Sequence, residues 1–407
     1  MTDFEDPKRY WAWHDRHGYQ RFVNVSGTMT GLGGSIVRKD IREAVEATMA
    51  RFVKIHDLQT HASRVIAELT GAEAGCITAS ASAGLTLCVA ATMTGMDPAR
   101  AEALPTAPGE RNEVVIQLGH LCGYGAPVST GIELAGATVR PVGQSTLAMD
   151  HQLEGALTDR TAAAMYVVSH HVVHYGQIPL GRFIEIAHAK GVPVIVDGAS
   201  EYDLKGFIDA GADLAVYSAQ KFLGGPTAGI IAGKRDLVRS AYLQNIGIAR
   251  GMKAGKESIA GAIAAMEAWQ RLDHDAIREE QTAALELWQQ ALDGIEGIRA
   301  FPIPDPTGNP LERLQVHVSE DVLGTTAATV ARALGQRDPA IVVRDHEVEL
   351  GYFQLDPCNL APGHADIVAD ALRETVSKAG SLTPSDDDLA RARQGSIEGY
   401  LNWLARK

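Results

Sequence analysis

Two residues capable of acid–base chemistry, Asp197 and Lys221, each follow a short apolar stretch of the chain. Residues 192–196 are mostly β-branched and apolar and stop at Asp197, while residues 214–217 lead into Ser218 and Lys221. Short apolar runs separated by helix-like stretches are typical of strands in a parallel sheet, because both faces of such a sheet are covered. Ligands of these sheets bind at the carboxyl ends of the strands. We therefore expect both side chains to project into one crevice.

A carboxylate and a lysine at neighbouring strand ends suit pyridoxal phosphate. This cofactor needs a lysine with which it forms a Schiff base, and an acidic group that keeps its pyridinium nitrogen protonated so that the ring can accept electrons. For an isolated pair a simpler alternative exists, in which Asp197 caps the turn that follows it and Lys221 is a solvated loop lysine. The surrounding sequence favours the cofactor.

That surrounding sequence resembles the fold-type I pyridoxal-phosphate enzymes, most clearly in VIVDGAS and ADLAVYSAQKFLGGPTAGIIAGKRDLV. It is similar in particular to the group related to bacterial selenocysteine synthase, which includes D-glucosaminate-6-phosphate ammonia-lyase. In that group the lysine of the S-x-x-K-x-L-x-G-P stretch carries the cofactor, and the aspartate of V-D-A/G-A faces the ring nitrogen. The resemblance implies these roles for Lys221 and Asp197.

The resemblance extends over about residues 20–380 and implies a fold. It is the α/β fold of fold-type I transferases, which is aspartate aminotransferase-like. A large domain on a parallel or mixed sheet is joined to a small α+β domain. The expected divisions are an N-terminal arm with the loop that follows it, the large cofactor-binding domain, the small domain and a C-terminal helix, at residues 1–40, 41–270, 271–384 and 385–407.

Individual elements follow from periodicity and turn residues. We expect one long charged helix over about residues 265–292 and a surface loop at residues 96–112. In the small domain, strands are expected at residues 314–318, 340–344 and 348–353. The N-terminal arm carries several aromatic residues, which we expect to pack at a dimer interface. The C-terminal helix carries apolar residues at helical spacing and should dock on the body of the protein or on a partner subunit.

A small-residue loop at residues 80–84 follows a predicted strand and precedes an apolar helix. Unpaired N–H groups and the helix dipole at such a helix start favour an anion, although serine and alanine also begin many helices for capping reasons alone. The resemblance implies that this loop holds the cofactor phosphate. The residues assigned to it are Ser80, Ala81, Ser82 and Ala83, with Ser218 as an additional hydroxyl donor.

His120 follows a predicted strand at residues 114–118, within Q-x-G-H. A histidine in this position is most often structural, whereas the resemblance implies that its ring stacks on the pyridine face of the cofactor.

Three more histidines, His170, His171 and His174, follow the predicted strand at residues 162–168. They suit general acid–base catalysis or contact with a substrate hydroxyl. A metal site is disfavoured, because no nearby carboxylate or cysteine completes a ligand set. Relatives carry a G-H-N-P-like sequence here. This chain departs from it, so the substrate of those relatives is not transferred to it.

Asn24 and Thr28 lie in a loop rich in Gly, Ser and Thr after a short predicted strand. By itself this pattern indicates a flexible loop, whereas the resemblance implies that it lines the substrate pocket. Lys253 and Lys256 precede a predicted helix, where lysine is electrostatically disfavoured. They are either solvated, or they meet an anion: cofactor phosphate across a subunit interface or an acidic substrate.

Arg344 follows the predicted strand AIVV in the small domain. In fold-type I enzymes this domain supplies an arginine whose planar fork binds the substrate carboxylate, and we assign that role to Arg344. The competing interpretation is a surface ion pair with Asp345 or Glu347.

Composition limits the partners. A net charge of −13 argues against a nucleic acid as a main partner, because binding a polyanion requires a basic footprint and the sequence has no Lys/Arg-rich arm. Its four cysteines show no C-x-x-C spacing, so neither a disulfide scaffold nor zinc is expected. No apolar run is long enough to cross a bilayer, and no signal peptide is evident. We expect a cytoplasmic homodimer or larger homo-oligomer that acts on a small amino acid.

The predicted chemistry begins when a substrate amine displaces Lys221, which then removes the α-proton while Asp197 and the ring stabilise the carbanion. Our first choice is β-elimination that yields ammonia and a 2-oxo acid, with one of the three clustered histidines assisting the leaving group. Racemisation, retro-aldol cleavage and transamination are alternatives. An inactive cofactor-binding homologue that serves as a sensor or partner subunit is a further alternative, against which the intact Asp197, Lys221 and phosphate loop argue. Selenium transfer on tRNA would need a basic surface.

Overall fold

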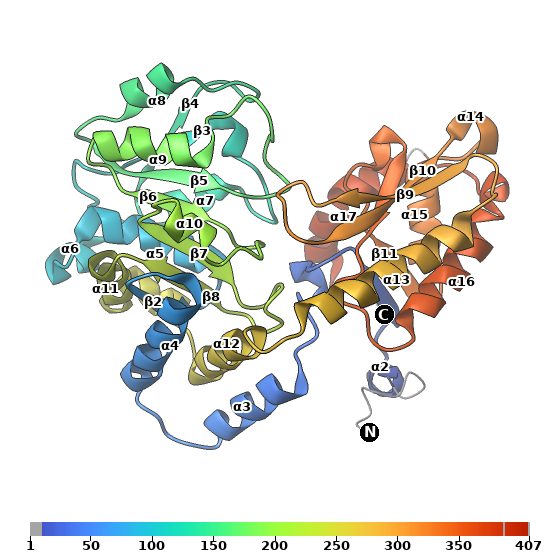
Figure 1. The fold of residues 1–407 in the computed structure, drawn as a ribbon, viewed down its shortest axis with the longest axis horizontal. Coiled ribbons are helices and arrows are strands. Elements are labelled where there is room, and N and C mark those ends of the chain that lie inside the picture. Colours follow the sequence, from blue (N-terminus) through green and yellow to red (C-terminus); the bar gives the residue numbers. More distant parts are fainter. Residues whose placement is uncertain (1–9, 386, 406–407) are drawn as a thin grey trace. The chain divides into compact units, whose positions relative to one another are not determined.

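The computed structural model describes residues 10–385 and 387–405 (Figure 1). The chain divides into two compact units. One comprises residues Ile36–Leu272, and the other combines Met1–Ser35 with Asp273–Lys407. Residues 1–9 of the predicted N-terminal arm, and residues 386, 406 and 407 of the predicted C-terminal segment, lie outside the described residues.

The Ile36–Leu272 unit is built on a seven-stranded mixed sheet with the strand order β2-β8-β7-β6-β5-β3-β4. Strand β8 is antiparallel to both of its neighbours, and the other six strands share one direction. The predicted parallel or mixed sheet is therefore confirmed. The strands are β2 Ala74–Thr78, β3 Glu113–Gln117, β4 Thr138–Val142, β5 Thr161–Val167, β6 Val194–Asp197, β7 Leu214–Ser218 and β8 Gly229–Gly233.

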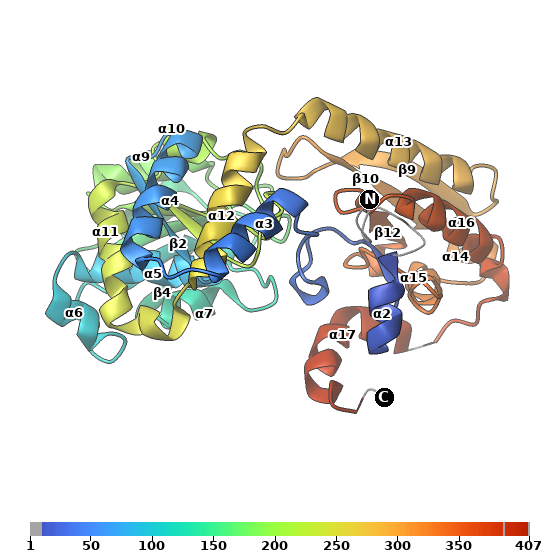
Figure 2. The ribbon, with the colours of Figure 1, turned by 90° about the horizontal axis from the view of Figure 1, so that it is seen from below.

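Helices cover both faces of this sheet (Figures 1 and 2). One face packs against α5 Ala81–Thr94, α7 Val128–Glu133 and α11 Arg235–Leu243. The other packs against α4 Ile55–Thr70, α8 Asp150–Ala156, α9 Leu180–Ala189 and α12 Lys256–Trp269, and α3 Lys39–Met49 lies against α12. Two short helices, α6 Pro98–Ala103 and α10 Gly206–Asp209, complete the unit. Because both faces are buried, the central strands are apolar along most of their length, and polar residues such as Asp197 and Ser218 stand at their carboxyl ends.

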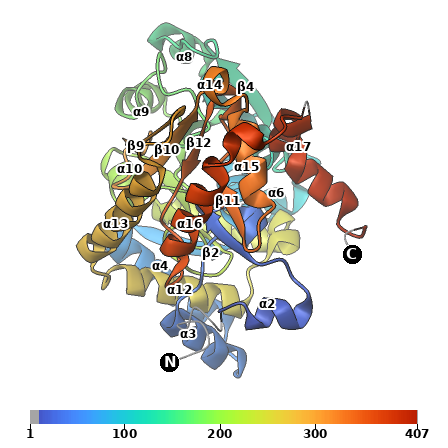
Figure 3. The same ribbon diagram turned by 90° about the vertical axis from the view of Figure 1, so that its right-hand side faces the viewer.

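The other unit is α+β (Figure 3). Strands β9 Ile298–Pro304, β10 Glu312–Val318 and β12 Tyr352–Leu355 form an antiparallel sheet in the order β12-β10-β9. Strand β1 Phe22–Val25 pairs in parallel with β11 Ala340–Val343. The helices are α2 Ala12–His17, α13 His274–Leu292, α14 Glu320–Leu323, α15 Ala327–Gly335, α16 His364–Val376 and α17 Asp387–Asn402. The core includes the fully buried Trp288 of α13.

Three element predictions were wrong. The expected long helix over residues 265–292 is two helices. The Asp273 carboxylate accepts the N–H of Ala276 (3.0 Å) and is the N-cap at which the second helix, α13, begins. The expected loop at residues 96–112 contains α6, capped by Asp97 and with Pro98 in its first turn. The expected strand at residues 348–353 begins with a 3₁₀ turn, and β12 starts only at Tyr352.

Apolar residues of the terminal helices differ in burial. Tyr10 and Trp11 contact the ring of His364, at 4.7 and 5.4 Å between ring centroids. The first half of α17 packs on the core of its unit through Leu389 and Ala392, so the predicted docking of this helix on the body holds for that half, whereas the apolar residues further along the chain are exposed. The exposed residues are Ile397, Tyr400 and Leu401 of α17 and Leu404 just beyond it. Their docking on a partner subunit stays a prediction. Within the described residues, no helix has the length and apolarity to span a membrane.

Candidate active site

The residues assigned from the sequence to the cofactor meet at one edge of the seven-stranded sheet. Strands β2, β3, β5, β6 and β7 all run in the same direction, so their carboxyl ends lie at this edge. In the strand register, Asp197 lies between Val167 of β5 and Val216 of β7. Gly229 of β8 lies between Ser218 and Thr78. The fold thus brings together segments that are more than a hundred residues apart.

Asp197 is the last residue of β6 and only 4% exposed. Its Oδ1 accepts the N–H of Ala199 at 3.2 Å. Burial raises the pKa of this carboxyl to about 6, and the Ala199 N–H and the charge of Lys221 partly oppose that shift. A cation beside this carboxyl would favour its ionised form, and a protonated ring nitrogen is such a cation.

Lys221 lies just beyond β7, and its Nζ donates to Oγ of Ser200. Burial lowers the pKa of the Lys221 amine, whereas the carboxylates of Asp197 and Glu201 act to raise it. Removal of the amine from water makes the neutral form, which is the nucleophile and the base, more accessible. Lys221 is therefore partly buried and hydrogen-bonded rather than a freely solvated loop lysine, whereas Asp197 does accept a hydrogen bond from the turn that follows it, as the alternative expected.

The predicted phosphate loop is the amino terminus of α5. The Ser80 Oγ caps this helix by accepting the N–H of Ala83 at 3.1 Å. In the part of the chain that the structure describes, the backbone N–H groups of Ala81 and Ser82 donate to no protein acceptor. A Cβ on Gly229 would lie 2.2 Å from the Ser80 carbonyl oxygen, so only glycine allows β8 to approach the loop this closely.

These groups fit pyridoxal phosphate. Two free N–H groups at the start of a 14-residue helix suit a phosphate. A buried carboxylate suits the ring nitrogen, and a partly buried lysine suits the aldehyde. The buried Ser218, at the end of β7, offers a further hydroxyl at the same edge.

His120 is 2% exposed and lies at the same sheet edge. Its Nδ1 accepts the N–H of Val167 at 3.2 Å, and its ring meets that of Tyr166 edge to face at 4.5 Å. Burial, with a smaller contribution from His174, lowers the pKa of His120 to about 4. The imidazole is therefore neutral near pH 7, which suits a ring contact better than proton donation.

The histidines after β5 lie in a loop tied to the His120 segment by the N–H of Val173, which donates to the Gly119 carbonyl at 3.1 Å. His170 is half-buried, and its ring centroid lies 3.9 Å from that of the exposed His171. His174 is also exposed. Across residues 10–385 and 387–405, no group of three or more His, Cys, Asp or Glu side chains is arranged to hold a metal ion.

Lys256 has a structural partner. Its Nζ donates to the carbonyls of Met49 (2.9 Å) and Arg51, at the carboxyl end of α3. The carboxyl end of that helix carries partial negative charge, so it can be the negative neighbour that the position of Lys256 before a helix suggested. Lys253 is exposed. Contact of either lysine with substrate or cofactor stays a prediction.

The other predicted substrate residues belong to the second unit. Asn24 holds its own loop, because its side chain donates to the Gly27 carbonyl (2.8 Å) and accepts the Ser26 N–H (2.9 Å). Thr28 is half-buried in the same loop.

Arg344 is 5% exposed, so a surface ion pair was the wrong interpretation. Among the described residues its guanidinium makes no hydrogen bond or ion pair, whereas the neighbouring Arg313 binds Asp305 at 2.7 Å and Asp356 at 2.9 Å. Burial and the Arg313 charge lower the pKa of Arg344. The charges of Glu347, Asp356 and Asp305 act in the opposite direction, although none of these carboxylates forms an ion pair with Arg344 among the described residues.

Residues 22–321 match the family of L-seryl-tRNA selenium transferases (SelA). The chain belongs to the SelA family. It is 37% identical over 362 residues to D-glucosaminate-6-phosphate ammonia lyase of Salmonella typhimurium, covering 89% of this chain and 97% of that one. It is 35% identical over 373 residues to 5'-C-glycyluridine monooxygenase-decarboxylase of a Streptomyces species, covering 90% and 92%.

Solved structures agree with this membership. A structure of D-glucosaminate-6-phosphate ammonia-lyase superposes with a TM-score of 0.81 at 35% identity, covering 90% of this chain and 98% of that one. An aspartate aminotransferase of Thermus thermophilus gives 0.55 at 14% identity, covering 91% and 95%, which shows the fold alone. The predicted fold-type I, aminotransferase-like fold is confirmed. The SelA family and these structural neighbours are pyridoxal-phosphate enzymes.

Two residues beside Lys221 were missed by the sequence analysis of this SelA-family chain. Ser200 and Glu201 come three and four residues after Asp197 in DGASE, yet their proximity to Lys221 depends on how two loops fold against each other. The signal was available, because the segment after a strand that carries a functional residue lies at the same sheet edge.

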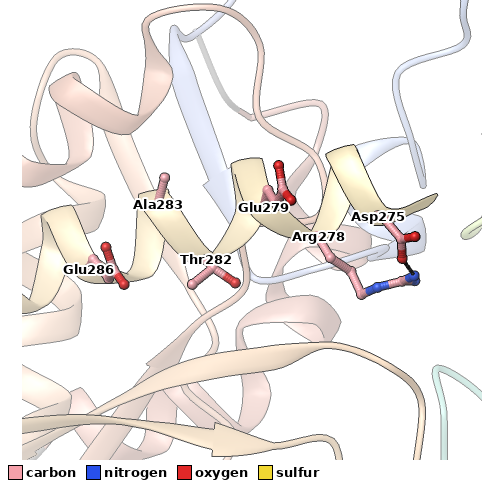
Figure 4. Close-up of a pocket in the computed structure, with 6 residues that line it drawn as sticks. All are labelled: Asp275, Arg278, Glu279, Thr282, Ala283 and Glu286. Carbon is pink, nitrogen blue, oxygen red and sulfur yellow. Dashed lines mark hydrogen bonds and ion pairs between the residues drawn. The ribbon is translucent and has the colours of Figure 1, made fainter. Parts of the chain in front are cut away.

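A hollow elsewhere on the molecule does not belong to this site. Figure 4 shows it on the surface of α13, lined by Asp275, Arg278, Glu279, Thr282, Ala283 and Glu286. Arg278 is paired with Asp275, and the lining comes from a single helix. None of the residues predicted for catalysis lies there.

Proposed function

We propose that this SelA-family chain is a pyridoxal-phosphate-dependent ammonia lyase that converts a 2-amino-3-hydroxy acid to ammonia and a 2-oxo acid. The observation that carries the proposal is the buried Asp197 and the partly buried, hydrogen-bonded Lys221 at one sheet edge, together with the free N–H groups of α5. Similarity to an ammonia lyase over most of both chains supports elimination as the reaction. Net loss of ammonia leaves a carbonyl at C2 and a methylene at C3, so the atoms balance without another reactant.

Each residue of the site has a proposed task. The N–H groups of Ala81 and Ser82 and the hydroxyls of Ser80 and Ser218 hold the cofactor phosphate. Asp197 keeps the proton on the ring nitrogen. Bound pyridoxal phosphate supplies an electron-accepting ring conjugated to the substrate nitrogen. The Lys221 amine, released from the cofactor by substrate, removes the proton on C2.

The departing hydroxyl needs a proton donor. We assign this task to His171 or His174, which lie in the loop beside His120 and are open to solvent. His120 itself is suited to packing against the cofactor ring, because its pKa of about 4 leaves it neutral.

The proposed substrate class rests on the hydroxylated compounds in the relatives' names and on the positive charge of Arg344. The names of the two relatives above denote amino acids on sugar-derived, hydroxylated skeletons. The histidine loop departs from the family pattern, so we propose 2-amino-3-hydroxy acids as a class rather than either relative's substrate. Arg344 is proposed to bind the substrate carboxylate, since its buried guanidinium has no protein partner among the described residues.

Replacing Arg344 with glutamine should raise KM by about 10–100-fold, the effect of losing a charge-assisted hydrogen bond of about 1.5–3 kcal/mol, and should change kcat less. Steady-state kinetics measure both. The exposed Arg299, in the same unit, provides the control variant Arg299→Gln. An unchanged KM in Arg344→Gln would exclude the arginine from carboxylate binding.

The function is tested by incubating the cofactor-loaded protein with a panel of 2-amino-3-hydroxy acids that includes D-glucosaminate-6-phosphate. Release of ammonia and a 2-oxo acid in equal amounts is expected. Accumulation of the opposite enantiomer would indicate a racemase, an aldehyde product would indicate an aldolase, and transfer of nitrogen to an added 2-oxo acid would indicate an aminotransferase. Cofactor binding without turnover of any compound would favour the inactive homologue.

A second candidate is oxidative decarboxylation, because the identity to the monooxygenase-decarboxylase is almost as high as that to the lyase. Elimination needs no oxygen, whereas this reaction consumes O₂ and releases CO₂. The same panel, assayed in air and without oxygen, separates the two. Selenium transfer on tRNA is disfavoured by the net charge of −13.

A further inference from the structure

The turn that follows Asp197 is fastened to β7, next to the strand end that carries Lys221. The N–H of Gly198 donates to the Val216 carbonyl at 3.0 Å, and the N–H of Ser218 donates to the Ala199 carbonyl at 3.2 Å. Within the turn, the N–H of Glu201 donates to the Gly198 carbonyl at 3.0 Å. The backbone therefore sets the position of the Ser200 side chain.

The Ser200 hydroxyl meets the Lys221 amine directly. Nζ of Lys221 donates to Oγ of Ser200 in a partly buried environment. A hydroxyl can both accept and donate, so it can remain bonded to the amine in its charged form and in its neutral form. Without this partner, the partly buried amine would lose a directional hydrogen bond within the protein.

Carboxylates complete the surroundings of the amine. Glu201, the residue after Ser200, is 8% exposed, and Asp197 lies at the adjacent strand end. Both charges favour the protonated amine, and burial opposes them. Charge alone, however, does not orient an amine on a flexible four-carbon stem. The directional contact on this amine comes from Ser200.

We propose that Ser200 is a positioning residue, which holds the Lys221 amine toward the site whenever the amine is not joined to the cofactor. That condition applies before the cofactor is loaded and while substrate has displaced Lys221. The inference rests on the proposed function, because it requires that Lys221 accepts pyridoxal phosphate.

The experiment measures covalent attachment of pyridoxal phosphate to cofactor-free protein as a function of pH. Attachment at Lys221 is trapped with borohydride at timed intervals and quantified by peptide mass spectrometry. At high pH the amine is neutral, so the plateau rate reports its position, while the midpoint of the profile reports its protonation. Ser200→Ala should lower the plateau rate about tenfold, as expected for one lost hydrogen bond. It should also move the midpoint to lower pH.

Two variants act as controls. Ser200→Thr keeps the hydroxyl and should restore both the plateau and the midpoint. Ser240→Ala removes a serine hydroxyl that donates to the Asp236 carbonyl in α11, and should leave both unchanged. Thermal unfolding of each cofactor-free variant shows that it is folded.

The outcomes separate the two proposals. Normal attachment in the wild type with an unchanged plateau in Ser200→Ala would overturn the positioning role and leave the proposed function intact. Equal slowing in Ser200→Thr would also count against it. A wild type that attaches no cofactor at Lys221 would overturn the proposed function, and with it this inference.

Discussion

The Lys221→Ala variant is expected to attach no pyridoxal phosphate covalently and to turn over at least about 10³-fold more slowly than the wild type. Alanine removes both the group that joins the cofactor and the base that takes the C2 proton, so two steps fail together. Among the described residues, no other lysine is assigned to this sheet edge. The measurement combines the absorption spectrum of the protein with added cofactor and the rate of ammonia release.

The matched control is Lys205→Ala, which removes an exposed lysine from the same unit. It should keep the visible absorption band of the lysine-bound cofactor and full activity. Thermal unfolding should show that Lys221→Ala remains folded, because the buried Asp197 carboxyl that loses the nearby Lys221 charge can take up a proton instead. A visible band of full intensity in Lys221→Ala would place the cofactor on another lysine and remove the basis of the proposed mechanism.

Much of this site could be predicted because its signals are local. Asp197 and Lys221 stand at the ends of apolar runs, and Ser80 begins a helix after a strand, so three short segments sufficed. In a parallel arrangement those segments share one sheet edge without further information.

Other parts depend on contacts that sequence spacing does not reveal. Asp345 and Glu347, the acids nearest to Arg344 in the chain, form no ion pair with it among the described residues. Asp305 and Asp356 form ion pairs with Arg313 instead. Lys256 lies at the start of one helix but interacts with the end of another, α3, about 200 residues earlier. Ser200 is 21 residues from Lys221 and reaches it only because the two loops are hydrogen-bonded together.

Element boundaries failed for a different reason. The charged stretch over residues 265–292 has continuous helical periodicity, and a single capping side chain, that of Asp273, divides it. A cap of this kind is worth about 1 kcal/mol. That is too little to stand out against periodicity in the sequence, but it is enough to define where a helix begins.

Replacing Asp197 with asparagine should lower activity by roughly 10²–10⁴-fold. Asparagine has the same shape but carries no charge, so the protonated ring nitrogen would lose its buried partner. Loss of one member of a buried pair costs about 3–5 kcal/mol, and each 1.36 kcal/mol is a factor of ten. The rate of ammonia release measures the effect, and Asp197→Glu, which keeps the charge, should recover part of it. Activity within tenfold of wild type in Asp197→Asn would exclude a pairing role.

The same substitution should stabilise the cofactor-free protein, with a defined pH dependence. The folded-state pKa of Asp197, about 6, lies above the usual value of 3.8, so the folded state binds the proton more tightly than the unfolded state. Its contribution to stability is present below about pH 4 and is lost as the pH rises through 6. The side-chain amide of the Asp197→Asn variant does not titrate. The free energy of unfolding of the variant should therefore exceed that of the wild type by near zero at acid pH and by about 3 kcal/mol above pH 7, as urea unfolding of cofactor-free protein at several pH values would measure.

Addition of pyridoxal phosphate should make the wild type the more stable of the two proteins, because only the wild type gains a charge pair. A carboxylate that destabilises the empty site yet stabilises the loaded one is what a cofactor partner requires, whereas a structural capping aspartate would destabilise neither.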